Sequence, residues 1–406
     1  MKIRPLTLSF VMTLFVAAIS VQLSAQAQPK TMGSVDSLAR NNLHLPHAGK
    51  GSYRPTVRPN ADEGTAITSA LIDDSAPSSS ILTFDVPKAG KGYFQGTYAI
   101  DENSNGAITG YYQDAKNVNH GFLRTPDGAT TAFDAPGAGK GANQGTTTQG
   151  INVELAITGY YADANYLSHG FLRTSSGVFT TFDVPGALNT YAENINATGT
   201  ISGYYEDAEY NRNHGFVRAA DGAITTFDAP GALNTLVIFT GMTANGAITG
   251  TCDDEDGNTH GFLRSPNGRT ITVFDVYGSL LTAGEGTTTT TDQRVAGFYA
   301  DKNFVFHGFL RSPSGSITEF SDPLAGLGGF QGTEGFSVNP SHTSTGIYID
   351  SNNVVHGFVR SPAGDFTTID GPGAIETDPE VIDTAGQVTG YYFDKNEAAH
   401  GFIYIP

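Results

Sequence analysis

The sequence contains no tryptophan, a single cysteine (Cys252) and few basic residues, 22 lysines and arginines against 40 aspartates and glutamates. One cysteine cannot form a disulfide within the chain, so packing and strand pairing must hold the fold together. The formal charge of -18 disfavours nucleic acid and anionic lipid as partners, because acidic chains repel phosphate groups. We therefore expect no nucleic-acid partner, and we expect the charge to keep the protein soluble.

Long apolar runs are also missing, since no segment after residue 27 approaches the roughly 20 apolar residues of a membrane-spanning helix. Near the N-terminus, a short apolar run follows two basic residues and precedes Ala25-Gln26-Ala27, which is the pattern of a secretory signal peptide. We predict a cleaved signal peptide over 1–27 and a flexible linker over 28–80, rich in Pro, Ser, Asn and Asp. The mature protein should be secreted or periplasmic, with no membrane span.

Short catalytic motifs are absent as well: the sequence has no Gly-x-Ser-x-Gly, no His-Glu-x-x-His, no phosphate loop and no zinc spacing. This weakens an enzymatic interpretation. The interpretation stays open, because hydrolases and lyases can assemble their sites from loops that no short motif reveals.

What the chain does contain is a repeat, which is counted most easily by the tripeptide His-Gly-Phe. It recurs at intervals of 44 to 49 residues, beginning at His120, His169, His214, His260, His307, His356 and His400. A period in this range is typical of propeller blades or solenoids. Each period holds four short β-type runs separated by turn residues and shows no helical periodicity, so the class is all-β.

The boundary between blades should lie at the longest irregular connection, which begins with Pro-Gly-Ala after a Phe-Asp pair. With that choice the chain opens on an orphan fourth strand, Ile81 to Asp85, and closes on an orphan third strand, Gly401 to Ile405. The two orphans complete one blade and remove exposed sheet edges. We therefore predict, over 81–406, a monomeric seven-bladed β-propeller of four-stranded antiparallel blades, closed by an N-terminal outer strand that pairs with the C-terminal blade.

The recurring Gly-Tyr-Tyr-x-Asp, His-Gly-Phe-Leu-Arg, Gly-x-x-Thr-Thr-Phe-Asp and Pro-Gly-Ala segments resemble the repeats of the bacterial extracellular HAF-type family. The resemblance covers about residues 81–406 and implies an exported protein without an assigned activity. The order of the strands also resembles NHL-type propeller blades, which is a likeness of fold that carries no function.

Polar residues recur in register at both ends of one loop in every repeat. The pairs are Asp114 and His120, Asp163 and His169, Asp207 and His214, Asp254 and His260, Asp301 and His307, Asp350 and His356, and Asp394 and His400. They could be metal ligands or acid–base pairs. Alternatively, Asp caps the turn while His bonds to a neighbouring strand or blade. Sevenfold repetition favours the structural role, because a catalytic centre needs one asymmetric constellation.

An arginine follows in the same strand of six repeats. Its fixed position among many carboxylates predicts charge-assisted bonds to Asp on an adjoining strand or blade, with a ring of anion-binding arginines as the alternative. These arginines are Arg124, Arg173, Arg218, Arg264, Arg311 and Arg360.

Two acidic segments suggest calcium as a cofactor. Asp101-x-Asn103-x-Asn105-Gly106 has the opening oxygen spacing of a calcium loop, although Tyr112 occupies the twelfth place, where a bidentate Glu is expected. The second segment consists of Asp253, Asp254 and Asp256, followed by Gly257. Residues of these types also make ordinary turns, so both interpretations stay open.

The loops between second and third strands, and those between blades, should open on one face, and they vary in sequence from blade to blade. They should expose Tyr166, Tyr210, Phe304 and Phe306. Variable loops on a rigid ring usually build a binding surface. The leading hypothesis is a binding or scaffold module for a glycan, a peptide or an envelope protein, with the lack of tryptophan counting against glycan. The alternative is a lyase or hydrolase in the central channel on that face, with or without a divalent cation.

Overall fold

The computed structural model describes residues 79–209, 212–287 and 292–406, and every helix or strand in these ranges is a β-strand. They belong to a compact unit that runs from Ser78 to Pro406. The predicted signal peptide and all but the last two residues of the predicted linker lie outside the described ranges. Within those ranges, no helix exists that could cross a membrane. The all-β prediction is confirmed.

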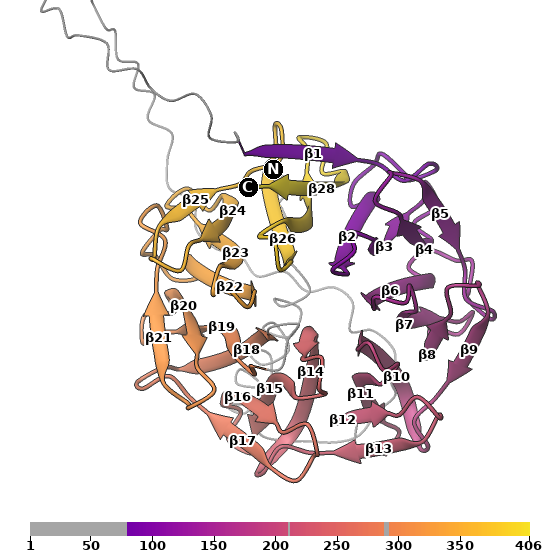
Figure 1. Ribbon diagram of the computed structural model, residues 1–406, viewed down its shortest axis with the longest axis horizontal. Helices are drawn as coiled ribbons and strands as arrows, with labels where there is room; N and C mark the ends of the chain where they lie inside the picture. The colour runs from indigo at the N-terminus through magenta and orange to yellow at the C-terminus, as the bar shows by residue number, and fades with distance from the viewer. Residues whose placement is uncertain (1–78, 210–211, 288–291) are drawn as a thin grey trace, which may run out of the picture. The chain divides into compact units, whose positions relative to one another are not determined.

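The strands follow one another round a ring, in the arrangement of a β-propeller (Figure 1). The innermost strands are β2 (Gly96–Glu102), β6 (Gly145–Ile151), β10 (Ala187–Ile195), β14 (Ala232–Met242), β18 (Leu281–Thr287), β22 (Gly332–Val338) and β26 (Glu376–Ile382). The second strands are β3 (Ile108–Gln113), β7 (Ile157–Ala162), β11 (Ile201–Asp207), β15 (Ile248–Asp254), β19 (Val295–Ala300), β23 (Ser344–Ile349) and β27 (Val388–Phe393). The third are β4 (Asn119–Arg124), β8 (Ser168–Arg173), β12 (Asn213–Arg218), β16 (Thr259–Arg264), β20 (Phe306–Arg311), β24 (Val355–Arg360) and β28 (Ala399–Ile405). The outermost are β5 (Thr130–Phe133), β9 (Phe179–Phe182), β13 (Ile224–Phe227), β17 (Ile271–Phe274), β21 (Ile317–Phe320), β25 (Phe366–Thr368) and β1 (Ser80–Phe84).

Consecutive strands pair antiparallel within each group of four, for example β10 with β11, β11 with β12 and β12 with β13. The group that contains the C-terminus takes its fourth strand from the other end of the described chain. There, β1 pairs antiparallel with β28, from Ser80 opposite Ile405 to Phe84 opposite Gly401. The first and last described strands are therefore neighbours (Figure 1).

The core between the sheets is built from the phenylalanine of each His-Gly-Phe tripeptide. All of these rings have 0% exposure: Phe122, Phe171, Phe216, Phe262, Phe309, Phe358 and Phe402. Several meet the outer-strand phenylalanine of the preceding group edge to face, as Phe122 meets Phe84 with 6.2 Å between ring centroids. Such aromatic pairs stabilise beyond the area that they bury. The repeat therefore supplies both the core of one sheet and its contact with the next.

Among the described residues, none of the recurring arginines bonds to an aspartate on an adjoining strand or group, so that prediction is wrong. Each guanidinium instead lies over the outer-strand phenylalanine of the preceding group, as a cation–π contact. The guanidinium carbon is 4.4 to 4.9 Å from the ring centroid in the pairs Arg124 and Phe84, Arg173 and Phe133, Arg218 and Phe182, Arg264 and Phe227, Arg311 and Phe274, and Arg360 and Phe320. The same arginine therefore ties neighbouring sheets together.

The innermost strand presses closely on the second strand at the glycine of Gly-Tyr-Tyr. A Cβ atom on Gly110 would lie 2.0 Å from the carbonyl oxygen of Tyr98, and one on Gly203 would lie 2.0 Å from that of Tyr191. Beside this contact the pairing register of the innermost strand shifts, between Ala99 and Asp101 in β2. One inner-strand residue is left over at each such bulge. We call these residues the bulge positions: Ile100, Gln149, Glu193, Glu285, Phe336 and Glu380.

Candidate functional site

The loops between second and third strands lie beside the connections between groups, which confirms the expectation that both open on one face. The backbone N–H of Asn143, in a connection, donates to the carbonyl of Asn117, in a second-to-third loop, at 2.6 Å. Phe330 donates in the same way to Phe304 at 2.7 Å. We call this side the loop face. The opposite side carries the turns between first and second strands, and we call it the hairpin face.

The predicted binding residues of the loop face differ in exposure. Tyr166 is 60% exposed, and Phe304 is 39% exposed and stacks on Phe330 with 5.5 Å between centroids. Phe306 is only 3% exposed, so its predicted exposure is wrong. It begins β20 and packs edge-on against Phe298 at 5.6 Å, because strand pairing starts earlier than the sequence suggested. Tyr210 lies outside the described residues.

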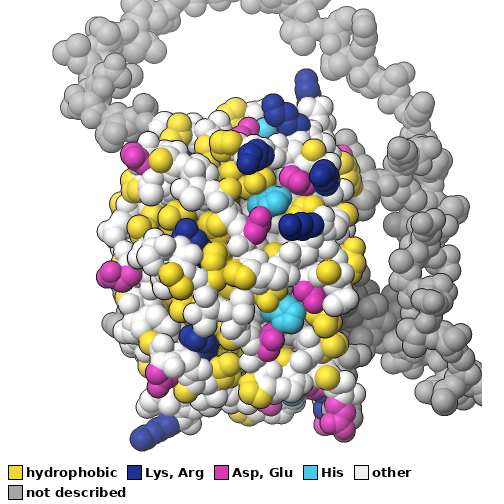
Figure 2. All heavy atoms as spheres, turned by 90° about the vertical axis from the view of Figure 1, so that its right-hand side faces the viewer, with side chains coloured by type: hydrophobic (Ala, Val, Ile, Leu, Met, Phe, Trp, Pro, Cys, Tyr) yellow, Lys and Arg dark blue, Asp and Glu magenta, His cyan; other side chains and the backbone are white. Residues whose placement is uncertain are grey.

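The recurring aspartates and histidines form a cluster in each group. In the first, Oδ1 of Asp114 accepts hydrogen bonds from the backbone N–H groups of Lys116 and Val118, which caps the turn. Nδ1 of His120 lies 2.8 Å from Asp134 at the end of the outer strand, and its Nε2 lies 3.6 Å from Asp114. The imidazole also stacks on Tyr112 at 4.9 Å. Figure 2 shows histidines at the surface with acidic side chains beside them.

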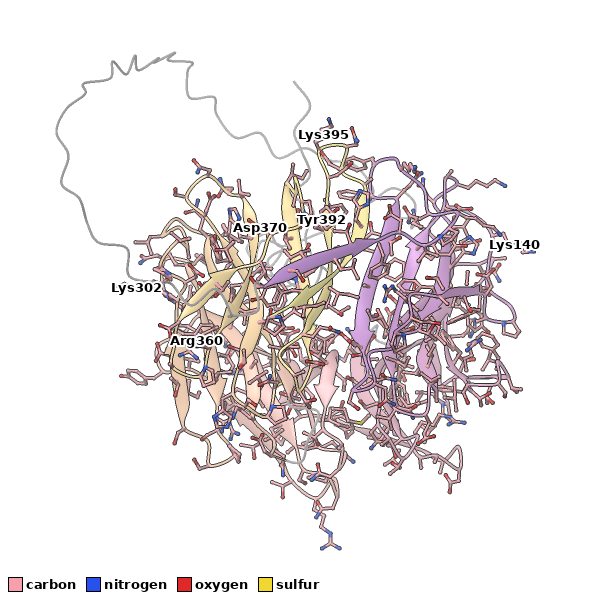
Figure 3. All side chains as sticks on the ribbon, turned by 45° about the horizontal axis from the view of Figure 1, so that its top comes forward. Lys140, Lys302, Arg360, Asp370, Tyr392 and Lys395 are labelled. Carbon is pink, nitrogen blue, oxygen red and sulfur yellow. The ribbon has the colours of Figure 1, made fainter. Side chains whose placement is uncertain are left out.

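The same cluster recurs around the loop face with small changes. The aspartates at the ends of the outer strands are Asp85, Asp134, Asp183, Asp228, Asp275 and Asp370, and Ser321 takes this place beside His307. Asp85, which follows β1, bonds to His400 of β28. Lysines project from the same side, including Lys140, Lys302 and Lys395 (Figure 3). Such repetition supports the structural interpretation of the Asp and His pairs.

Removal of one cluster histidine should cost little, and the cost should depend on pH. The hydrogen bond with Asp134 raises the pKa of His120 above its usual value. A raised pKa stabilises the fold below the unfolded pKa of about 6.5, and that contribution is lost as pH rises through the folded value. We expect His120→Gln to lower the free energy of unfolding by about 1 kcal/mol at pH 6 and by less at pH 9. Urea titrations at both pH values check this, and an equal loss at both would contradict it.

The first predicted calcium segment is engaged in bonds that hold adjacent sheets together. Asp101 accepts from the backbone N–H groups of Glu102 and Ile151, at 2.9 and 2.8 Å. Oδ1 of Asn103 accepts from the N–H groups of Asn105 and Ala107, while Nδ2 of Asn103 donates to the carbonyl of Asn152 at 2.8 Å. Asn105 itself donates to the carbonyl of Val153. These oxygens therefore serve a turn and a contact between groups.

The second segment is likewise bonded within the protein. Asp253 accepts from Thr259 and Asn234, and Asp254 accepts from the backbone N–H groups of Asp256 and Asn258. In the described ranges, no group of three or more His, Cys, Asp or Glu side chains is arranged to hold a metal ion. Calcium binding at either segment stays a prediction.

The fourth repeat diverges from the others, with Thr251 and Cys252 in place of Tyr-Tyr, so it is the best place to look for the site of the alternative, enzymatic function. Both side chains are buried, and burial raises the pKa of the Cys252 thiol to about 12. A thiol with so high a pKa is not a nucleophile at neutral pH. Cys252 instead packs in a core cluster with Val237, Ile248 and Phe262.

A cavity of about 330 Å³ opens at the centre of the hairpin face. The C-terminal ends of the innermost strands and the turns after them line it, and its walls combine apolar side chains such as Ile195, Met242 and Ile382 with polar ones such as Asn194 and Thr240. The sequence reasoning missed this cavity, because it placed the functional surface on the loop face. The available signal was the polar residues at four of the six bulge positions, namely Gln149, Glu193, Glu285 and Glu380.

Two carboxyl groups at this cavity have strongly raised pKa values. Burial raises the pKa of Asp101 to about 7, against the hydrogen bonds from Ile151 and Glu102. Burial also raises the pKa of Glu102 to about 7. Glu102 accepts from Thr389 at 2.6 Å and also from Gln387, so it joins β2 to the group that contains β26 and β27.

Comparison with known protein families finds no family that matches the chain, and no curated protein matches it either. Among solved structures, one described as a streptogramin B lyase matches with a TM-score of 0.54 at 12% identity, over 80% of this chain and 98% of that one. TolB from Acinetobacter baumannii matches with a TM-score of 0.43 at 10% identity, over 75% of this chain and 65% of that one. The lectin BP39L from Burkholderia pseudomallei gives 0.43 at 8% identity, over 80% and 95%. At such identities the likeness to the lyase is one of fold alone.

Proposed function

We propose that this protein is a binding module whose ligand enters the cavity at the centre of the hairpin face. The cavity itself is the observation that carries the proposal. Its volume of about 330 Å³ falls in the range of small-molecule sites, which runs from about 300 to 1,000 Å³. Apolar side chains with a few polar groups among them are the usual lining of such sites.

Binding is favoured over catalysis by the groups that line the cavity. Its described lining residues include no histidine, cysteine or lysine. The buried Cys252 and the capped Asp and His clusters are engaged elsewhere in structural contacts. The predicted contacts of Tyr166 and Phe304 on the loop face would form a second, separate surface.

The proposed frame of the site is a closed ring of seven four-stranded blades. In support, the described ranges contain 28 strands, and β1 supplies the partner that the outer edge of β28 needs. A closed ring would hold the inner-strand ends in fixed positions around the cavity. We also propose that the chain is exported and belongs with the HAF-type repeat proteins, on the strength of its N-terminal pattern and its repeats.

A tryptophan placed at the cavity rim should abolish ligand binding. Ala244 is exposed and lines the cavity, so Ala244→Trp should fill its mouth. Ala115, exposed on the loop face, gives a matched control, Ala115→Trp. We expect a ligand found by thermal shift in a panel of glycans, peptides and amines to raise the Tm of wild type and of Ala115→Trp by several degrees. Ala244→Trp should show no shift. Loss of the shift in Ala115→Trp alone would place the site on the loop face and contradict the proposal.

A further inference from the structure

Resting on the proposed binding module, we propose that the ligand of the central channel carries a protonated primary amine, held by glutamates of the innermost strands. These glutamates are Glu193 of β10, Glu285 of β18, Glu334 of β22 and Glu380 of β26. They come from different sheets, and the ring brings the four strands together at its centre (Figure 1).

The bulges direct three of these side chains to the same level of the channel. Glu193, Glu285 and Glu380 occupy bulge positions in their strands, and the register shifts on either side of each residue in the same way. Side chains at this level meet across sheets, since Nε2 of Gln149, also a bulge position, donates to Oε2 of Glu193 at 3.0 Å. The equivalent glutamates therefore point toward a shared space.

Several oxygens of these buried carboxyl groups have no hydrogen-bond partner among the described residues, although Glu193 accepts one bond from Gln149 and Glu380 one from Tyr391. Glu193 is 2% exposed, and its Oε1 atom accepts no hydrogen bond. Glu285 and Glu334 are buried too, and neither side chain forms a hydrogen bond or ion pair with another described residue. A buried polar atom without a partner is costly, so native proteins rarely keep one unless something else satisfies it. A ligand with N–H donors would supply the missing bonds.

Repulsion between neighbouring glutamate carboxylates also favours binding of a cation. Burial, with the nearby Glu334 as the second cause, raises the pKa of Glu285 to about 8. Burial raises the pKa of Glu380 to about 8 as well, with Glu285 as the next cause. These carboxyl groups therefore favour the protonated form at neutral pH, and a bound ammonium group would displace the protons because it stabilises the ionised carboxylates. An amine fits better than a metal ion, since the described side chains form no metal-binding group.

Tyrosine rings lie near two of the glutamates: Tyr160, Tyr191 and Tyr204 near Glu193, and Tyr111 near Glu380. Tyr191, two residues before Glu193, stacks on Tyr204 at 4.8 Å and meets Tyr160 edge-on at 5.0 Å. Tyr98 stacks on Tyr111 at 4.7 Å in the same manner. Carboxylates combined with aromatic rings form the environment that organic cations prefer, because both groups attract positive charge.

The cavity of the hairpin face gives access to this layer. Asn194 and Ile195, which directly follow Glu193, line the cavity, and so do Val381 and Ile382, which directly follow Glu380. The glutamates thus lie one residue deeper along strands whose ends form the walls. An amine on a slender chain could enter from the hairpin face and place its charge at the glutamates.

Calorimetry with 1,4-diaminobutane on the full mature protein tests the proposal. We expect saturable binding, release of protons at pH 7 as judged in buffers of different ionisation enthalpy, and no binding of the neutral 1,4-butanediol. Glu193→Gln and Glu285→Gln should each weaken binding at least tenfold, while Glu255→Gln, which removes an exposed charge on the loop face, should bind as wild type does. Binding of Nα-acetyl-lysine amide as well would extend the class to lysine side chains of peptides, and its absence would restrict the class to free polyamines.

The amine proposal would be overturned if both Glu193→Gln and Glu285→Gln bound 1,4-diaminobutane with wild-type affinity. It would also be overturned if 1,4-butanediol bound as tightly as the diamine. Circular dichroism of each variant shows that it is folded, and the glutamine side chains match glutamate in size, so a loss of binding reports on charge. A neutral ligand could raise the Tm of wild type but not of Ala244→Trp while 1,4-diaminobutane raises neither. That result would support the binding module and contradict the amine ligand. If no ligand effect depends on Ala244→Trp, the module itself fails.

Discussion

A chain that begins at Pro87, without β1, is expected to lose its cooperative thermal transition or to melt at least about 10 °C lower. This truncation removes β1, whose residues Ser80 to Phe84 pair with β28. It also removes Phe84, which contacts Phe122 and lies under the guanidinium of Arg124. Deletion of a large buried aromatic side chain alone costs about 3 to 5 kcal/mol, and an unpaired strand edge invites aggregation.

The matched control is a chain that begins at Ser78, the first residue of the compact unit. It keeps β1 and should melt as the mature protein does in differential scanning calorimetry. A synthetic peptide of residues 78–87, added to the truncated chain, should restore part of the lost stability by mass action. If the chain beginning at Pro87 melts like the control, β1 does not close the ring.

The second large effect concerns pH: Tm should be roughly 20 °C higher at pH 5.5 than at pH 8.5. Burial raises the pKa values of Glu193, Glu285, Glu334 and Glu380 to about 8. The unfolded chain releases these protons near pH 4.5 and the folded chain only near pH 8, so stability falls as pH rises between those values. Each pKa unit corresponds to about 1.4 kcal/mol, which for a chain of this size shifts Tm by about 2 °C.

Glutamine variants separate this cause from general repulsion among the many acidic residues. Glu285→Gln and Glu380→Gln cannot ionise, so their Tm should change less between pH 5.5 and pH 8.5 than that of wild type. Glu255→Gln, which removes an exposed carboxylate, should retain the full dependence. A wild-type Tm that is flat or rises over this interval would show that the channel glutamates ionise normally.

The fold could be predicted in most respects because one local pattern repeats with little change. The turn after Asn103 and the strand pair that places Tyr161 opposite His169 recur in many repeats. A strand or turn that is ambiguous in one repeat can therefore be assigned from the others. Strand ends were placed within a residue or two: the expected Ile81 to Asp85 is Ser80–Phe84. Phe306 shows the limit, since a two-residue difference in where β20 begins decides whether that ring is buried.

Contacts between repeats were harder to predict. The positions of Arg124 and Phe133 were both regular in sequence, but the spacing does not say which copy of phenylalanine each arginine meets. With 40 acidic residues in the chain, a carboxylate partner was the natural expectation. Arg173 lies over Phe133 of the preceding group, a pairing that depends on the angle between sheets.

The candidate site was missed for a related reason. The bulge positions, which lie just before the strand ends that line the cavity, differ from strand to strand, with Ile100 in one strand, Gln149 in the next and Glu193 in the third. No motif marks such a set, because its members are related only by the meeting of the inner strands. The prediction chose the loops because their sequences vary between repeats. The residues that line the central cavity instead come from the ends of the innermost strands and the turns after them.

The pairing of β1 with β28 also determines how the ring responds to mechanical force. Ser80 lies opposite Ile405, so the two ends of the paired segment leave the sheet at the same point. Tension that pulls residue 79 away from the C-terminus would load the hydrogen bonds one after another, beginning at Ser80 and ending at Phe84, and would not load them all at once. A propeller held by its N-terminal segment against a pull on its C-terminus would therefore unzip at this strand at low force.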